Sequence, residues 1–76
     1  MLKPQMSLAE AFRRRDEIQQ AGRSVYFSGS PGEELYEIEL VDRSHNKPNW
    51  YVVMLRREDD HATSLNLPGE MMVNVK

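Results

Sequence analysis

The chain has 76 residues, of which 39% are hydrophobic and 29% charged, and its ten Lys and Arg against twelve Asp and Glu give a formal net charge of −2. This length predicts one small domain over residues 1–76, with a hydrophobic core of marginal size. The chain has no cysteine, which excludes disulfides, cysteine zinc sites and thiol chemistry. The slight acidic excess argues against a general affinity for nucleic acid.

The longest apolar run extends from Trp50 to Leu55, which is far too short to span a membrane. Residues 1–6 contain no apolar stretch typical of a secretion signal, and we interpret them as a flexible N-terminus. These features predict a cytoplasmic protein with no membrane partner.

The first predicted element is a helix over residues 8–21. Ser7 and Glu10 fit the S-x-x-E capping box, in which the serine hydroxyl accepts a hydrogen bond from an amide of the first turn. Gly22 tolerates the left-handed conformation in which many helices end. Apolar residues recur at helical spacing along this segment and are expected to face a core: Leu8, Phe12, Ile18 and Ala21.

Three strands are expected after the helix, at about 24–28, 35–41 and 50–57. These stretches are rich in β-branched and aromatic residues and are separated by turn formers. The second strand alternates cleanly between apolar residues and the acidic Glu37 and Glu39, which is typical of a half-buried antiparallel strand. Short connections favour pairing of successive strands as hairpins.

The C-terminal segment predicts a fourth strand at about 71–75, at the edge of the sheet, and an irregular packed loop at 65–69. The predicted fold class is therefore α+β, with an N-terminal helix packed on a three- to four-stranded antiparallel sheet in the order αβββ. The helix is expected to pack against the inward residues of the first two strands: Val25, Phe27, Tyr36, Ile38 and Leu40.

The third strand is apolar on both faces, and we interpret one face as a docking surface. Alternate side chains point to opposite sides of a strand, so Trp50 and Tyr51 lie on different faces. One helix covers only one face of a small sheet. The residues that we predict to bind a partner are Glu37, Glu39, Trp50, Tyr51, Val53 and Leu55.

Two questions about this surface stay open from the sequence alone. Depending on register, the carboxylates lie beside one of two apolar sets, either Tyr51, Val53 and Leu55 or Trp50, Val52 and Met54. Alternatively, the segment 58–70 covers the second face through Leu65 and Leu67, which would leave an ordinary surface.

No residue pattern predicts catalysis or a cofactor. His45 lies among turn formers, where a lone histidine is typical of a solvated side chain. Asp59, Asp60 and His61 are consecutive, so their side chains diverge, whereas metal ligands converge from separated positions. We therefore expect no catalytic residue, no cofactor, no metal site and no small-molecule substrate.

The strongest basic cluster is Arg13, Arg14 and Arg15, which carries the alternative prediction of a nucleic-acid-binding accessory module. Successive helical residues lie about 100° apart, so the three guanidinium groups fan around the helix. Acidic residues three and four positions away, such as Glu10, neutralise at least two of them. We favour a solvated helix face.

The sequence therefore favours a small non-enzymatic protein-binding module, a regulator or inhibitor that docks on a larger protein or pairs with a second copy of itself. Aromatic residues beside charged rims are typical of interface anchors. We interpret the small size and the lack of a known motif as features of a host-directed regulator such as viruses and mobile elements encode.

Overall fold

The structure is a computed structural model that describes residues 2–28, 34–56 and 63–76. Within these ranges the chain forms, in order, β1 (Gln5–Ser7), α1 (Leu8–Arg13), α2 (Arg15–Gln20), β2 (Val25–Phe27), β3 (Tyr36–Arg43), β4 (Trp50–Leu55), β5 (Ser64–Pro68) and β6 (Met72–Val75). The strands form one antiparallel sheet in the order β1-β6-β2-β3-β4-β5. The α+β class is confirmed, but the sheet is larger than the predicted three to four strands.

The strands β2, β3 and β4 lie where the sequence predicts strands, and they pair with one another in the predicted order. Residue 57, the last of the predicted third strand, lies outside the described residues.

The predicted helix at 8–21 is present as two short helices, because the backbone of Arg14 departs from helical geometry at φ −101° and ψ 18°. The hydroxyl of Ser7 accepts a hydrogen bond from the amide of Glu10 at 3.2 Å, which confirms the predicted cap. Gly22 follows α2 at φ +71°, and its amide donates to the carbonyl of Gln19 at 3.0 Å. The predicted left-handed stop is therefore present.

Each of the two short helices contributes buried residues to the core. Leu8 in α1 is 0% exposed, and Ile18 in α2 is 3% exposed. Ala21 is exposed, contrary to the expected apolar stripe, because α2 ends at Gln20.

Both ends of the chain are incorporated into the sheet in ways that the local sequence did not predict. Gln5 and Met6, within the segment 1–6 that was expected to be flexible, belong to β1, which pairs with β6. β6 itself lies between β1 and β2 and is not the expected edge strand. Burial explains its position, because Val73 is 0% and Val75 is 2% exposed. Residues 65–69, expected to form an irregular loop, provide most of β5, which pairs with β4.

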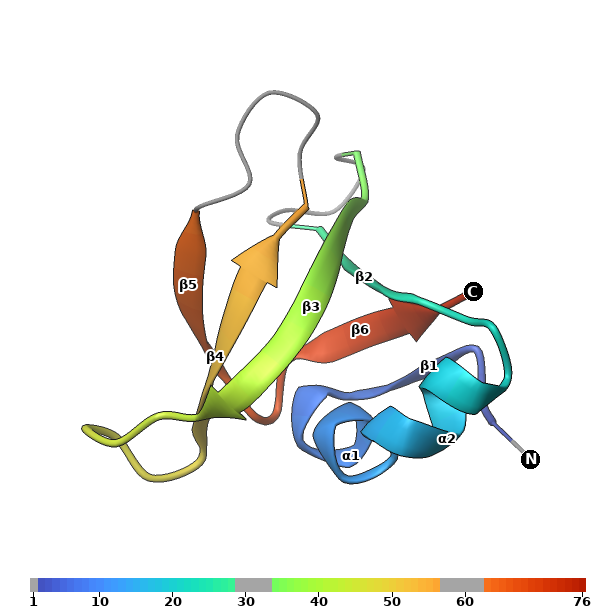
Figure 1. The fold of residues 1–76 in the computed structure, drawn as a ribbon. Coiled ribbons are helices and arrows are strands. Elements are labelled where there is room, and N and C mark those ends of the chain that lie inside the picture. Colours follow the sequence, from blue (N-terminus) through green and yellow to red (C-terminus); the bar gives the residue numbers. More distant parts are fainter. Residues whose placement is uncertain (1, 29–33, 57–62) are drawn as a thin grey trace.

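The sheet is strongly curved, and Figure 1 shows β6 crossing the direction of β3 and β4, with α1 and α2 lying together near one end of the molecule. The first turn of α1 is attached to the turn between β5 and β6. Its amides at Leu8 and Ala9 donate to the carbonyl oxygens of Met71 at 2.7 Å and Gly69 at 2.9 Å. These hydrogen bonds satisfy two of the donors that a helix start leaves unpaired.

The core lies inside the curve of the sheet. It consists of Met6, Leu8, Ala11, Ile18, Val25, Phe27, Ile38, Tyr51, Val53, Val73 and Val75. Apart from Ala21, every residue predicted to face the core belongs to this cluster or packs against it, as Phe12, Tyr36 and Leu40 do.

Candidate protein-docking surface

The strand β4 separates its side chains into two faces, and the structure decides which face meets the core. Tyr51 and Val53 are buried, with 8% and 0% exposed. The alternate residues Trp50, Val52 and Met54 are half-buried and lie on the opposite side of the sheet. The register places Met54 opposite Glu39 and Val52 opposite Asp42 on β3. We call this set the outer strand face: Trp50, Val52, Met54, Glu39 and Asp42.

A β-bulge brings Asp42 onto the outer strand face. The register between β3 and β4 shifts between Leu40 and Asp42, which inserts one additional residue into β3. Without this insertion, Val41 would share a face with Glu39, and Asp42 would point inward. The sequence contains a signal for the bulge, because two consecutive apolar residues, Leu40 and Val41, interrupt the alternation with acidic residues.

The same bulge directs Arg43 to the core side, opposite Tyr51. Its guanidinium carbon lies 6.0 Å from the centroid of the Phe12 ring, and that of Arg15 lies 4.5 Å from the same centroid. Phe12 in turn packs against Tyr51 with ring centroids 5.0 Å apart. Two cations are therefore held against one aromatic ring at the border between α1 and β3.

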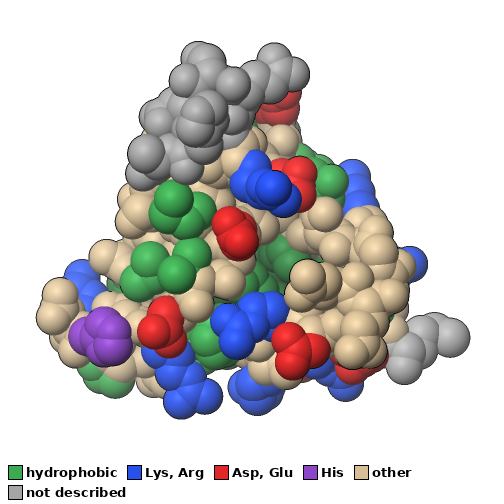
Figure 2. Space-filling view, in the orientation of Figure 1, with side chains coloured by type: hydrophobic (Ala, Val, Ile, Leu, Met, Phe, Trp, Pro, Cys, Tyr) green, Lys and Arg blue, Asp and Glu red, His purple; other side chains and the backbone are tan. Residues whose placement is uncertain are grey.

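The two carboxylates of the outer strand face are not neutralised by the described side chains. Among these residues, no Lys or Arg lies within ion-pair distance of Glu39 or Asp42. Glu37 differs, because one of its carboxylate oxygens lies 3.5 Å from a guanidinium nitrogen of Arg56. Figure 2 shows hydrophobic side chains gathered on this side of the molecule, bordered by acidic side chains.

Trp50 lies at one end of the outer strand face, where the loop between β3 and β4 reaches it. The ammonium nitrogen of Lys47 lies 4.5 Å from the centroid of the Trp50 ring, which is a cation–π distance. On the other side, Trp50 pairs with Pro68 at the end of β5. The face therefore ends in an aromatic ring with a cation at its rim.

The structure answers whether Leu65 and Leu67 cover the second face of β4. Both lie opposite the two buried residues of β4 and therefore point to the core side. β5 extends the sheet and presents Asn66 on the outer side. Residues 58–62, the first part of the expected covering segment 58–70, lie outside the described residues.

Three of the predicted partner-binding residues lie on the core side of β4, so the predicted docking surface has to be corrected. Tyr51 and Val53 are buried, and Leu55 is partly buried and packs against the core. Strand alternation prevents these side chains from reaching a partner on the outer strand face. Val52 and Met54, which belong to the other register considered above, take their place.

The three arginines at 13–15 do not form one basic stripe. Arg14 lies between two glutamates, 3.6 Å from Glu10 and 3.8 Å from Glu17. Arg15 is directed to the aromatic ring described above. The guanidinium groups of Arg14 and Arg15 therefore lie in separate surroundings, as their helical spacing predicts.

No group of His, Asp and Glu in the described ranges is arranged to hold a metal ion. His45 is exposed in the loop between β3 and β4, whereas Asp59, Asp60 and His61 lie outside the described residues. Neither helix of the described chain has the length and apolar character needed to cross a membrane.

No protein-family model matches the chain, and no curated protein or solved structure matches it either.

Proposed function

We propose that the chain is a small non-enzymatic protein-binding module, a regulator or inhibitor that docks on a larger protein through the outer strand face. The observation that carries this proposal is the row of Trp50, Val52 and Met54 on the side of the sheet opposite the core. Aromatic and methionine side chains are enriched in protein interfaces. Buried tryptophans are also frequent among the few residues that dominate binding energy.

The charges of the outer strand face favour a partner with a basic rim. Glu39 and Asp42 border the apolar row on β3 and have no basic neighbour within ion-pair distance among the described residues. Such carboxylates accelerate association with a basic surface and contribute to specificity more than to affinity. The association rate should therefore fall as salt is added.

The same charges disfavour a second copy of the chain as the occupant. A two-fold dimer brings the same patch of both subunits together. The outer strand face would then place its carboxylates near those of the second copy, and like charges in such proximity are destabilising. We therefore favour a different, larger protein.

The proposal is tested by comparing two variants that add the same charge at different places. Val52→Asp introduces a carboxylate into the apolar row, and Gln20→Glu introduces one on the exposed surface of α2. Proteins retained by the immobilised wild type from an extract of the source cells are identified, purified and measured by surface plasmon resonance. We expect Val52→Asp to weaken binding at least tenfold and Gln20→Glu to leave it within twofold.

Circular dichroism melting of both variants separates binding from folding. If Val52→Asp melts well below the wild type, the double variant Glu39→Lys with Asp42→Lys replaces it, because both side chains are exposed. This variant should slow association and reverse its salt dependence. Equal binding by all variants would contradict the proposal. Sedimentation equilibrium tests the alternative that the chain forms a dimer. If the wild type is a dimer and Val52→Asp is a monomer, the outer strand face binds a second copy of the chain and not a larger protein.

A further inference from the structure

A second surface feature arises where β2 and β3 separate. β2 pairs with β3 only up to the pair of Val25 and Ile38. Beyond this point Ser24 exchanges two backbone hydrogen bonds with Lys76, at 2.9 and 3.0 Å, while β3 continues along β4 to Arg43. In the described part of the chain, β3 therefore has no strand partner on its β2 side after Ile38.

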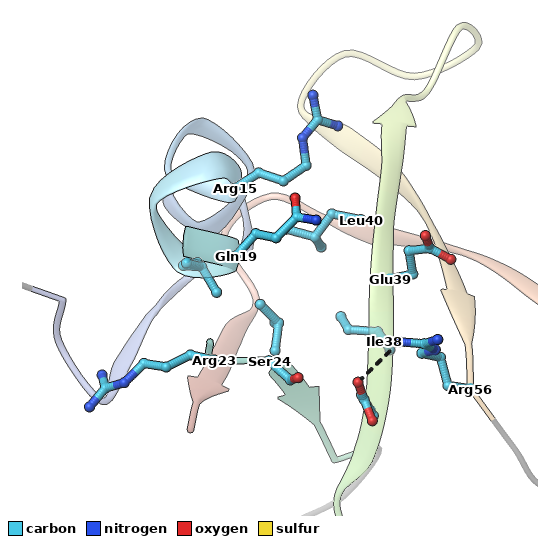
Figure 3. A pocket seen from close by; sticks show the side chains of 11 residues that line it. Arg15, Gln19, Arg23, Ser24, Ile38, Glu39, Leu40 and Arg56 are labelled. Atoms are coloured by element: carbon cyan, nitrogen blue, oxygen red, sulfur yellow. Dashed lines mark hydrogen bonds and ion pairs between the residues drawn. The ribbon is translucent and has the colours of Figure 1, made fainter. Parts of the chain in front are cut away.

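The separation leaves a cavity of about 230 Å³ between α2 and β3. Its apolar lining comes from both elements and from β2: Ile18, Val25, Ile38 and Leu40. Figure 3 shows Gln19 extending from α2 toward Leu40 on β3, with Ser24 at the other end of the gap. The volume is below the range of about 300 to 1,000 Å³ typical of sites for drug-sized ligands, and it suits a ligand about the size of one terminal amino-acid residue.

Backbone groups of β3 face this cavity. The amide of Arg56 donates to the carbonyl of Glu37 at 3.0 Å, so the backbone of Glu37 points toward β4. In an antiparallel ladder successive residues direct their N–H and C=O to alternate sides. The N–H and C=O of Leu40 therefore point away from β4, toward α2. They offer one donor and one acceptor to an extended ligand.

A positive charge lies next to this backbone pair. A guanidinium nitrogen of Arg15 lies 3.4 Å from the carbonyl oxygen of Val41, the residue after Leu40. Figure 3 shows Arg23 pointing away from β3 and Glu39 lying on the side of β3 opposite α2. Arg56, which also lines the cavity, is paired with Glu37 at 3.5 Å. Arg15 is thus the charged side chain that overhangs the groove.

We propose that this groove binds the C-terminal end of an extended peptide whose last residue is aliphatic. The terminal carboxylate accepts hydrogen bonds from the Leu40 N–H and from Arg15, and the amide of the last residue donates to the Leu40 C=O. The aliphatic side chain packs on Ile18 and Leu40. This arrangement combines strand addition with capture of a terminal carboxylate, two recurring modes of peptide recognition. The site is separate from the outer strand face and does not depend on the proposed function.

The test is a nuclear magnetic resonance titration of the full ¹⁵N-labelled chain with N-acetyl-Ala-Ala-Leu, as the free acid and as the C-terminal amide. The free acid should shift the Leu40 amide and the Arg15 Nε resonances and bind at least tenfold more tightly than the amide. Arg15→Gln should reduce the affinity for the free acid to that of the amide. Arg23→Gln, the matched control, should bind within twofold of the wild type.

Three results would overturn the proposal. The first is equal affinity for acid and amide, and the second is no shift of the Leu40 amide at millimolar peptide. The third is an equal response to acetate alone, which would make Arg15 an unspecific anion contact. The outer-face variant Val52→Asp should retain peptide binding, so a failure of this site is distinguishable from a failure of the protein-docking proposal.

Discussion

Gly69 is a position at which one added methyl group should destabilise the fold. It is buried in the turn between β5 and β6. A Cβ atom there would lie 2.8 Å from Cε1 of Tyr51, 2.9 Å from the carbonyl oxygen of Asn49 and 3.3 Å from Cβ of Ala9. The Asn49 carbonyl is held in place because it accepts the Gly69 amide at 2.6 Å. The Tyr51 ring is held by Phe12, whose centroid is 5.0 Å away.

Two opposing terms set the size of the effect of Gly69→Ala. Overpacking of this kind costs about 1–3 kcal/mol. Replacing glycine also reduces the conformational entropy of the unfolded chain, which stabilises by about 0.4–1 kcal/mol. We therefore expect the free energy of unfolding to fall by about 1–2 kcal/mol. For a chain of this size, each lost kcal/mol lowers the melting temperature by roughly 4–8 °C.

Urea denaturation followed by circular dichroism measures this change, with Gly22 as the comparison site. An added Cβ at Gly22 meets nothing within 4 Å, but the residue has φ +71°, so Gly22→Ala acts through backbone strain of about 1–2 kcal/mol. Asparagine tolerates the left-handed conformation, so Gly22→Asn should be more stable than Gly22→Ala. Gly69→Asn should be less stable than Gly69→Ala, because it adds a larger side chain where a Cβ atom already has no room. A Gly69→Ala protein as stable as the wild type would refute the steric reasoning.

Three further variants test the core, the helix cap and a surface ion pair. Ile38→Ala removes a side chain that is 4% exposed, and calorimetric or urea unfolding should show a loss of about 2–5 kcal/mol; a change below 1 kcal/mol would contradict the described core. Ser7→Ala removes the acceptor of the Glu10 amide and should cost about 0.5–2 kcal/mol, a loss that Ser7→Asp largely avoids if capping is the cause. Arg56→Gln breaks the pair with Glu37, in which the arginine side chain is 64% exposed. Because exposed ion pairs contribute little, the free energy of unfolding should fall by less than about 1 kcal/mol, with or without 1 M salt, and the melting temperature should change little.

The parts of the fold that the sequence predicted depend on neighbours within a few residues. The cap at Ser7 and the stop at Gly22 each involve groups less than one helical turn apart. The alternation around Ile38 likewise identifies a half-buried strand without reference to its partner. These features follow from local hydrogen bonding and side-chain spacing.

The strands at the two ends of the chain depend on contacts that are distant in sequence. β1 forms by pairing with β6, which places Gln5 opposite Asn74. No pattern within residues 1–6 indicates that pairing. β6 becomes an inner strand because β1 pairs on one side of it and β2 on the other. Short apolar segments of this kind form strands only when a neighbouring strand supplies hydrogen-bond partners.

Residue alternation was enough to predict that β4 has two apolar faces and that Glu39 lies on the side of β3 opposite the core. The folded sheet was needed to place Trp50, Val52 and Met54, and not their alternates, beside that carboxylate, because alternation defines two faces without saying which one meets the core. The groove next to Leu40 was also undetectable in the sequence. It exists because β2 leaves β3 to pair with β6, and such a divergence is a property of the folded sheet, set by strand pairings between residues far apart in the chain.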